Sequence, residues 1–394
     1  NTLIFSFLSP FSLGFSFLTS HLRFTEWGRS ISPNECLRSK SRARRFRCGT
    51  LYKPLCRRSE STLTAVVIAR EKRRLLESSS SALFKLHFGI PRSYTLIMTV
   101  EVYLKDMGYL LEGPHWDDVN NKLYYVDIFG NAIHRYDVAS QKDEKVDIGE
   151  SVGASVPTRS GKTLVAAKHK MGYVDWRTGN FETVAMVDKD KPTTRFNDGK
   201  CDPAGRLWAG TMGAEEVLAG VEKGKGSLFC LHTNMKVTKH VDDVDISNGM
   251  AWTSDLKTLY YIDTLRHGVD AFDYNHETAE LANRRQVVKV PDEEGLPDGM
   301  CIDSEGMLWV ALFNGDVINR YNPKTGEKLQ TIRFPTTNIT SCCWGGPNFD
   351  ELYVTSAKHF LTEEQKRTQP LAGSIFRVTG LGVKGVKCEP FNDS

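Results

Sequence analysis

Four side chains that carry carboxylate or amide oxygens occupy similar positions in four similar stretches of this sequence. Each lies 10 or 11 residues before a leucine in an apolar run, and each lies near a glycine. Such oxygens are the ligands that Ca²⁺, Mg²⁺ and Mn²⁺ prefer in proteins, whereas zinc sites are commonly built from cysteine and histidine. Four of them brought together could bind one hard divalent cation. They are Glu112, Asn197, Asn248 and Asp298.

One of these stretches, RFNDGKCDPAGRLWAGTM from Arg195 to Met212, also admits a simpler interpretation. Asp198-Gly199 could be a hairpin turn, because an Asp-Gly pair tolerates the positive φ angles that such turns need. A single pair of this kind is more often a turn than a ligand. The recurrence of oxygen-bearing side chains in one register favours a binding site, and the neighbouring glycines could let the backbone approach it closely.

A repeat along the chain sets that register. Six segments pair a polar turn with an apolar run, as in DPAGRLWAGTM and DSEGMLWVALF, and their leucines are 41 to 52 residues apart. Short strands at this period, with almost no amphipathic helix, predict four-stranded blades around a central channel. We therefore predict an all-β fold, a six-bladed β-propeller that forms one domain over residues 98–394. The repeat leucines are Leu123, Leu164, Leu207, Leu259, Leu308 and Leu352.

The propeller prediction gives the four oxygen-bearing side chains a common location. Equivalent positions on different blades lie on a ring around the axis, so these side chains would converge at the channel mouth, in a concave site with polar groups aimed inward. In the two remaining units the equivalent places hold small residues, near Gly153-Ala154 and Thr340-Ser341. The sequence contains no EF-hand loop, so a calcium ion would have to bind in the channel.

The first 97 residues differ sharply from the rest in composition. They carry 13 Arg and 4 Lys against 5 Glu and no Asp, a net charge of +12, which leaves −9 for the remainder. Their Arg- and Ser-rich stretches show no lasting period, so we predict a disordered leader. A remnant signal or anchor and a transit peptide are alternatives. We favour upstream sequence translated in frame, with Met98 as the start, because all nine methionines lie at or after it.

The composition argues against several classes of partner. A net charge of +3 gives no reason to expect nucleic acid, and no apolar run in residues 98–394 is long enough to span a membrane. Six of the nine cysteines lie in this part, with neither C-x-x-C pairs nor metal-ligand spacing to histidine. We expect buried free thiols, a reducing compartment (the cytoplasm, with the nucleus as an alternative) and a monomer. These cysteines are Cys201, Cys230, Cys301, Cys342, Cys343 and Cys388.

Several long motifs resemble those of the regucalcin/gluconolactonase (senescence marker protein) family. They include GPHWD, RFNDGKCDPAGRLWAGTM, DVDISNGMAW, LPDGMCIDSEGMLWVALFNG and the tail GLGVKGV. The resemblance runs in one register from about Tyr103 to the C-terminus and leaves the leader outside it. We expect an insect or other invertebrate member. One departure is Leu111, which precedes Glu112 where relatives commonly have glycine.

The resemblance implies a six-bladed propeller that binds one divalent cation (Ca²⁺, Zn²⁺, Mn²⁺ or Mg²⁺) and hydrolyses a small-molecule sugar lactone. Carried over position by position, the implied metal ligands are Glu112, Asn248 and Asp298. The implied substrate-binding residues are Arg195, Asn197 and Glu215, of which Glu215 is the weakest transfer because Glu216 is adjacent.

Lactone opening requires a polarised carbonyl and a water nucleophile, and a bound cation can serve the first need. We hypothesise that Asp298 both ligates the cation and accepts the proton from the attacking water. Arg195 and Asn197 would orient the sugar ring, although Arg195 could instead form a structural ion pair with Glu215. Two other functions remain open at this stage: a calcium-binding regulatory protein without enzymatic activity, and a luciferin-regenerating enzyme on the same fold.

Overall fold

The six repeat leucines all lie in the second strand of a four-stranded antiparallel sheet, and there are six such sheets. The computed structural model describes residues 97–215, 217–218 and 220–394. The prediction of a disordered leader concerns residues that lie outside the described part, apart from Ile97. The prediction of an all-β, six-bladed propeller is confirmed.

Each blade is a meander of four strands, numbered here from the channel outward. Blade 1 contains β2 (Leu111–Asp117), β3 (Lys122–Asp127), β4 (Ala132–Asp137) and β5 (Lys142–Asp147). Blade 2 contains β6 (Val152–Pro157), β7 (Thr163–Ala167), β8 (Lys170–Val174) and β9 (Phe181–Met186). Blade 3 contains β10 (Arg195–Cys201), β11 (Leu207–Met212), β12 (Gly226–Leu231) and β13 (Val237–Val244).

The second half of the wheel follows the same plan. Blade 4 contains β14 (Ser247–Trp252), β15 (Thr258–Asp263), β16 (Gly268–Tyr274) and β17 (Leu281–Lys289). Blade 5 contains β18 (Leu296–Ile302), β19 (Leu308–Phe313), β20 (Val317–Tyr321) and β21 (Lys328–Arg333). Blade 6 contains β22 (Ile339–Gly345), β23 (Glu351–Ser356), β24 (Ile375–Thr379) and β1 (Thr99–Leu104). Within the described residues, three short helical segments complete the elements: η1 (Thr264–Arg266), η2 (Asp292–Glu294) and α2 (Glu363–Thr368).

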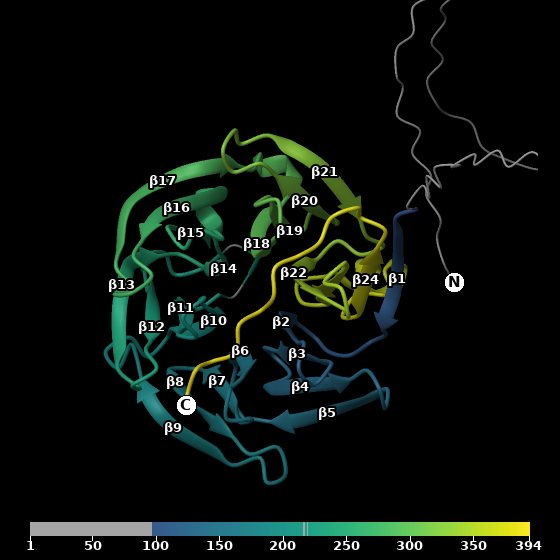
Figure 1. Cartoon of the computed structure of the whole chain (residues 1–394). Coiled ribbons are helices and arrows are strands. Elements are labelled where there is room, and N and C mark those ends of the chain that lie inside the picture. Colours follow the sequence, from purple (N-terminus) through teal and green to yellow (C-terminus); the bar gives the residue numbers. More distant parts are fainter. Residues whose placement is uncertain (1–96, 216, 219) are drawn as a thin grey trace, which may run out of the picture. The chain divides into compact units, whose positions relative to one another are not determined.

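Blade 6 closes the ring with strands from both ends of the described chain. β1 pairs antiparallel with β24, so a strand that precedes blade 1 forms the outer edge of the last blade. Figure 1 shows the result: the innermost strands β2, β6, β10, β14, β18 and β22 surround one axis, and the outermost strands form the rim. The described part contains no helix that is long and apolar enough to cross a membrane.

The hydrophobic core lies between the blades rather than in one central mass. Six buried clusters each join the facing sides of two neighbouring blades, including the pair formed by blades 6 and 1. The repeat leucines are fully buried in these layers, and Trp208 and Trp309 are buried beside two of them. The apolar alternation that predicts the strands therefore also provides each blade with two buried faces.

The C-terminal segment covers one end of the channel. After β24 it crosses the face of the wheel toward blades 2 and 3, as the yellow trace in Figure 1 shows. Gly385 forms an antiparallel bridge with Asp303, and Phe391 forms a parallel bridge with Thr158. The Phe391 side chain is fully buried. A ligand would therefore enter a pocket at the channel mouth from the other end of the channel, where the inner strands begin.

The turn after each of two inner strands is held by a buried aspartate. Asp202 is fully buried, and its carboxylate accepts hydrogen bonds from Arg206 Nε at 2.7 Å, Trp208 Nε1 at 2.9 Å and the Tyr274 hydroxyl at 2.8 Å. Asp303 accepts the same kind of bond from the tryptophan six residues later. Because Tyr274 belongs to blade 4, the Asp202 carboxylate also links two blades.

We expect Asp202→Ala to destabilise the fold by about 3–5 kcal/mol, because it leaves the buried Arg206 guanidinium without its counter-ion. Urea unfolding followed by circular dichroism measures the change. The matched control is Asp255→Ala in the corresponding turn of blade 4, where the aspartate is exposed and a change within about 1 kcal/mol is expected. Equal losses in the two variants would contradict the role given to the buried carboxylate.

Candidate metal centre

All six innermost strands break their pairing register at the same place. The break is a β-bulge or irregularity between the first and second strands of each blade. The four oxygen-bearing side chains identified in the sequence lie at or within these breaks, and Gly153 and Thr340-Ser341 lie within the other two. Because a bulge redirects side chains from the regular alternation, the four groups point inward rather than into the layers between blades.

The structure brings all six predicted site residues to one pocket at the channel mouth. Their side chains come from blades 1, 3, 4 and 5 and from the loop after β11, and the pocket has a volume of about 480 Å³ including its open mouth. The four oxygen-bearing residues are 3% to 7% exposed. The lining includes Glu112, Arg195, Asn197, Glu215, Asn248 and Asp298.

A chain of hydrogen bonds fixes the two amides. Asn197 Nδ2 donates to Asn248 Oδ1 at 3.1 Å and to the Ser247 carbonyl at 3.0 Å. Asn248 Nδ2 donates to Thr264 Oγ1 at 2.8 Å, and that hydroxyl donates to the Pro297 carbonyl at 2.9 Å. Blades 3, 4 and 5 are thus connected at the site, and the Asn248 amide is held in one orientation in the pocket that Asp298 also lines.

The carboxyl groups of Glu112 and Asp298 lie close enough to share a hydrogen bond across the channel. Burial raises the pKa of Glu112, and the nearby charge of Asp198 raises it further. Burial likewise raises the pKa of Asp298, and the Glu112 carboxylate is the next cause. Burial also raises the pKa of Asp198 to about 6. Three buried acidic groups therefore oppose one another's ionisation.

Arg195 supplies a positive charge at the pocket wall. Its Nη1 donates to Asn197 Oδ1 at 2.7 Å, and its guanidinium lies 5.4 Å from the centre of the Phe129 ring. Burial lowers the pKa of Arg195 to about 10, and the Glu215 carboxylate exerts the strongest opposing effect. The guanidinium therefore remains charged at neutral pH, in electrostatic contact with Glu215.

The residues present fit a divalent cation with hard oxygen ligands. Two carboxylates and an amide oxygen from three blades meet in a buried place where the acidic groups repel one another. A cation between them would replace that repulsion with attraction. Glu112, Asn248 and Asp298 are the residues that would hold it.

Two parts of the channel were not identified from the sequence. Asp198 lies inside β10 and accepts a hydrogen bond from the Gly199 amide at 2.7 Å, so the hairpin-turn alternative for Asp198-Gly199 is wrong. Lys200, two residues further along the strand, donates to the Met300 carbonyl at 2.5 Å. A bulge within β10 sets the direction in which these side chains point. A sequence pattern that assumes regular alternation along the strand does not reveal this bulge.

Comparison with known proteins shows the family of this chain. The family model described as "SMP-30/Gluconolactonase/LRE-like region" matches residues 110–358, which contain all six residues of the pocket discussed above. The chain belongs to the SMP-30/gluconolactonase/LRE-like family. Within that family, regucalcin of Xenopus laevis is 45% identical over 287 residues, which cover 73% of this chain and 96% of the relative. Human regucalcin is also 45% identical, over 70% of this chain and 92% of its own length.

Solved structures of other SMP-30/gluconolactonase/LRE-like proteins share the fold. A luciferin-regenerating enzyme matches with a TM-score of 0.69 and 34% identity, covering 74% of this chain and 99% of its own. A calcium-binding regucalcin from Agrobacterium tumefaciens matches with a TM-score of 0.68 and 26% identity, covering 74% and 97%. A gluconolactonase from Xanthomonas campestris matches at 19% identity with a TM-score of 0.57, which supports the fold alone.

Proposed function

We propose that this protein is a divalent-metal-dependent hydrolase of sugar lactones. The observation that carries the proposal is the convergence of Glu112, Asn248 and Asp298 at the channel mouth, beside the positively charged Arg195. Membership of the SMP-30/gluconolactonase/LRE-like family agrees with it. Ca²⁺, Mn²⁺, Mg²⁺ and Zn²⁺ are the candidate ions, and the oxygen ligands favour the first three.

Glu112, Asn248 and Asp298 would hold the cation, whose chemistry when bound is to polarise the lactone carbonyl. Asp298 takes the proton from the attacking water at a carboxylate oxygen while the water oxygen bonds to the carbonyl carbon. The bond from that carbon to the ring oxygen then breaks, and Asp298 returns the proton to the departing oxygen. One carboxylate can serve both steps because it starts and ends ionised.

Arg195, Asn197 and Glu215 would bind the hydroxyl groups of the substrate and fix its orientation. Arg195 is already oriented by its bond to Asn197, and the Asn197 side chain is held by blade 4. Apolar side chains form much of the remaining wall, among them Leu110, Ile128, Met212, Ile246 and Phe313. Such a wall limits water around the reacting atoms and strengthens the electrostatic interactions within the pocket.

The test is lactone turnover by the purified full chain, with a blank for spontaneous hydrolysis. On gluconolactone with Ca²⁺, Mn²⁺, Mg²⁺ or Zn²⁺, we expect turnover that a chelator lowers by at least about 100-fold and that the added cation restores, because carbonyl polarisation contributes several kcal/mol. No turnover with any ion, together with tight calcium binding, would favour the non-enzymatic regulatory protein. Turnover that survives chelation would refute metal dependence.

We further infer that the protein works in a reducing compartment such as the cytoplasm. All six cysteines within the described residues are free thiols, and five of them are buried. A secreted protein would be expected to use some of them in disulfides.

A further inference from the structure

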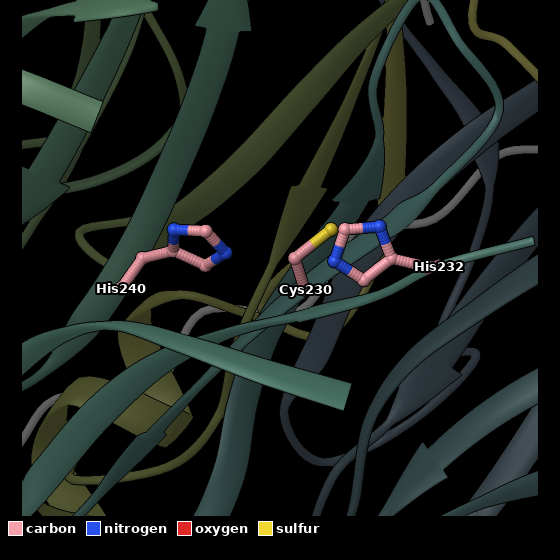
Figure 2. A group of neighbouring side chains, drawn as sticks. All are labelled: Cys230, His232 and His240. Atoms are coloured by element: carbon pink, nitrogen blue, oxygen red, sulfur yellow. The ribbon is translucent and has the colours of Figure 1, made fainter. Parts of the chain in front are cut away.

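A second group of metal-ligating side chains lies away from the channel, on blade 3. Cys230 lies in β12, His232 follows that strand, and His240 lies in β13. One ligand atom from each can be chosen so that all three lie within 4.8 Å of one another. Figure 2 shows the Cys230 sulfur between the two imidazole rings. The sequence expectation that this cysteine has no histidine at metal-ligand spacing is therefore corrected.

The hairpin between β12 and β13 explains the convergence. Cys230 is directly opposite Thr238 in the strand pairing, and His232 and His240 are each two residues further along their own chain segment. Side chains two residues apart in a regular strand lie on the same face, as for Cys230 and His232. His240 is the unpaired residue of a bulge in β13, and its contact with Thr238 shows that its ring lies on this side too. Residues 232 and 240 lie on opposite sides of the hairpin turn, so their separation along the sequence does not reveal that they are close in space.

The hydrogen bonds show where the two histidines point. Thr238 Oγ1 lies 2.8 Å from His232 Nε2 and 2.7 Å from His240 Nε2. Both Nε2 atoms therefore converge on the hydroxyl of Thr238, the residue directly opposite Cys230. A hydroxyl group has one proton and can donate to only one of the two rings, so at least one ring carries its proton at Nε2.

The surroundings suit a metal ligand set more than a reactive thiol. Cys230 is fully buried, Trp208 is opposite it on β11, and the Trp208 ring centre lies 4.6 Å from that of His240. Burial is the main cause that lowers the pKa of His240, to about 4, and that of His232. Both rings are therefore neutral, which is the form that binds metals. The nearby Arg206 is paired with Asp202.

We propose that Cys230, His232 and His240 bind one Zn²⁺-class ion on blade 3, separate from the channel site. One thiolate and two imidazoles are zinc ligands, in contrast to the oxygen ligands at the channel. On binding, the Cys230 thiol loses its proton to solvent. Each ring that is protonated at Nε2 instead carries its proton at Nδ1, and the ion replaces Thr238 as partner of both Nε2 atoms. A water completes the four ligands.

The expected consequence is structural. The ion would tie β12 to β13, the two outer strands of the blade, next to the layer that packs against blade 4. Zinc should therefore raise the melting temperature of the protein without being needed for turnover. This site and the proposed lactonase activity rest on different residues, so each can fail without the other.

The test uses Co²⁺ as the probe, titrated into the metal-free full chain in a Glu112→Gln background that weakens the channel site. We expect a thiolate-to-cobalt charge-transfer band that saturates at one equivalent and disappears when Zn²⁺ is added. Cys230→Ser should abolish the band, and His240→Ala should weaken Co²⁺ binding by at least about tenfold. The matched control is Cys201→Ser, another buried thiol in blade 3, which should keep the band.

Several results of this titration would refute the proposed zinc site. No band in the parent protein, or an unchanged band in Cys230→Ser, would overturn the proposal. If Cys230→Ser fails to fold, His232→Asn and His240→Ala decide the matter, because both histidines are only partly buried. Unchanged Co²⁺ affinity in both histidine variants would likewise refute the ligand set.

Discussion

Asp298→Asn is expected to reduce kcat for lactone hydrolysis by about 10²–10⁴-fold at saturating cation, the range that a general base contributes. The amide keeps the size of the side chain and one oxygen that can face the ion, but it cannot accept the proton of the attacking water. Asp298 is 6% exposed, so bulk water does not easily replace it. Initial rates at several cation concentrations distinguish loss of the base from weaker metal binding.

Asp198→Asn is the matched control for this experiment. Asp198 belongs to the same group of buried carboxylates and acts electrostatically on both Glu112 and Asp298, but it does not line the pocket. It should therefore lose far less activity than Asp298→Asn. If both variants lose equally, the effect comes from the total charge of the group. If Asp298→Asn keeps its activity, another residue is the base.

Much of the fold could be predicted because the apolar period is repeated six times. Each repeat leucine belongs to a second strand with two buried faces, and the polar turn before it ends the inner strand. The ring closure could not be predicted in this way. β1 contains TVEVYL, a short strand without the repeat leucine, and its place beside β24 depends on contacts between distant parts of the chain.

The candidate site was predictable to the extent that it follows the repeat. Glu112, Asn197, Asn248 and Asp298 share a register, so the propeller geometry brings them together. Asp198 was not predicted to be a channel residue, because an Asp-Gly pair is compatible with a turn and with a bulged strand. The Cys230, His232 and His240 group was missed for a different reason. It depends on the turn of one hairpin, and among the described residues it does not recur in another blade.

Glu112→Gln should stabilise the metal-free protein and reduce the stabilisation that the cation provides. Without the ion, Glu112 is a buried carboxyl whose pKa is raised first by burial and then by Asp198. At neutral pH, folding must therefore either protonate this carboxyl or bury its charge, and an uncharged amide of the same size avoids that cost. The variant should be more stable than the metal-free parent protein by about 1–3 kcal/mol. Thermal unfolding in the presence of a chelator measures this change.

Adding the cation should stabilise the parent protein more than the variant. At a concentration of about 100 times the dissociation constant, the ion stabilises the parent protein by about 2.7 kcal/mol, whereas the variant has lost a charged ligand and gains much less. The matched control is Glu182→Gln, an exposed glutamate on β9, which should behave as the parent protein in both conditions. If Glu112→Gln is less stable than the parent without the ion, the carboxylate supports the fold by itself. If both proteins gain equally from the ion, Glu112 is not a ligand.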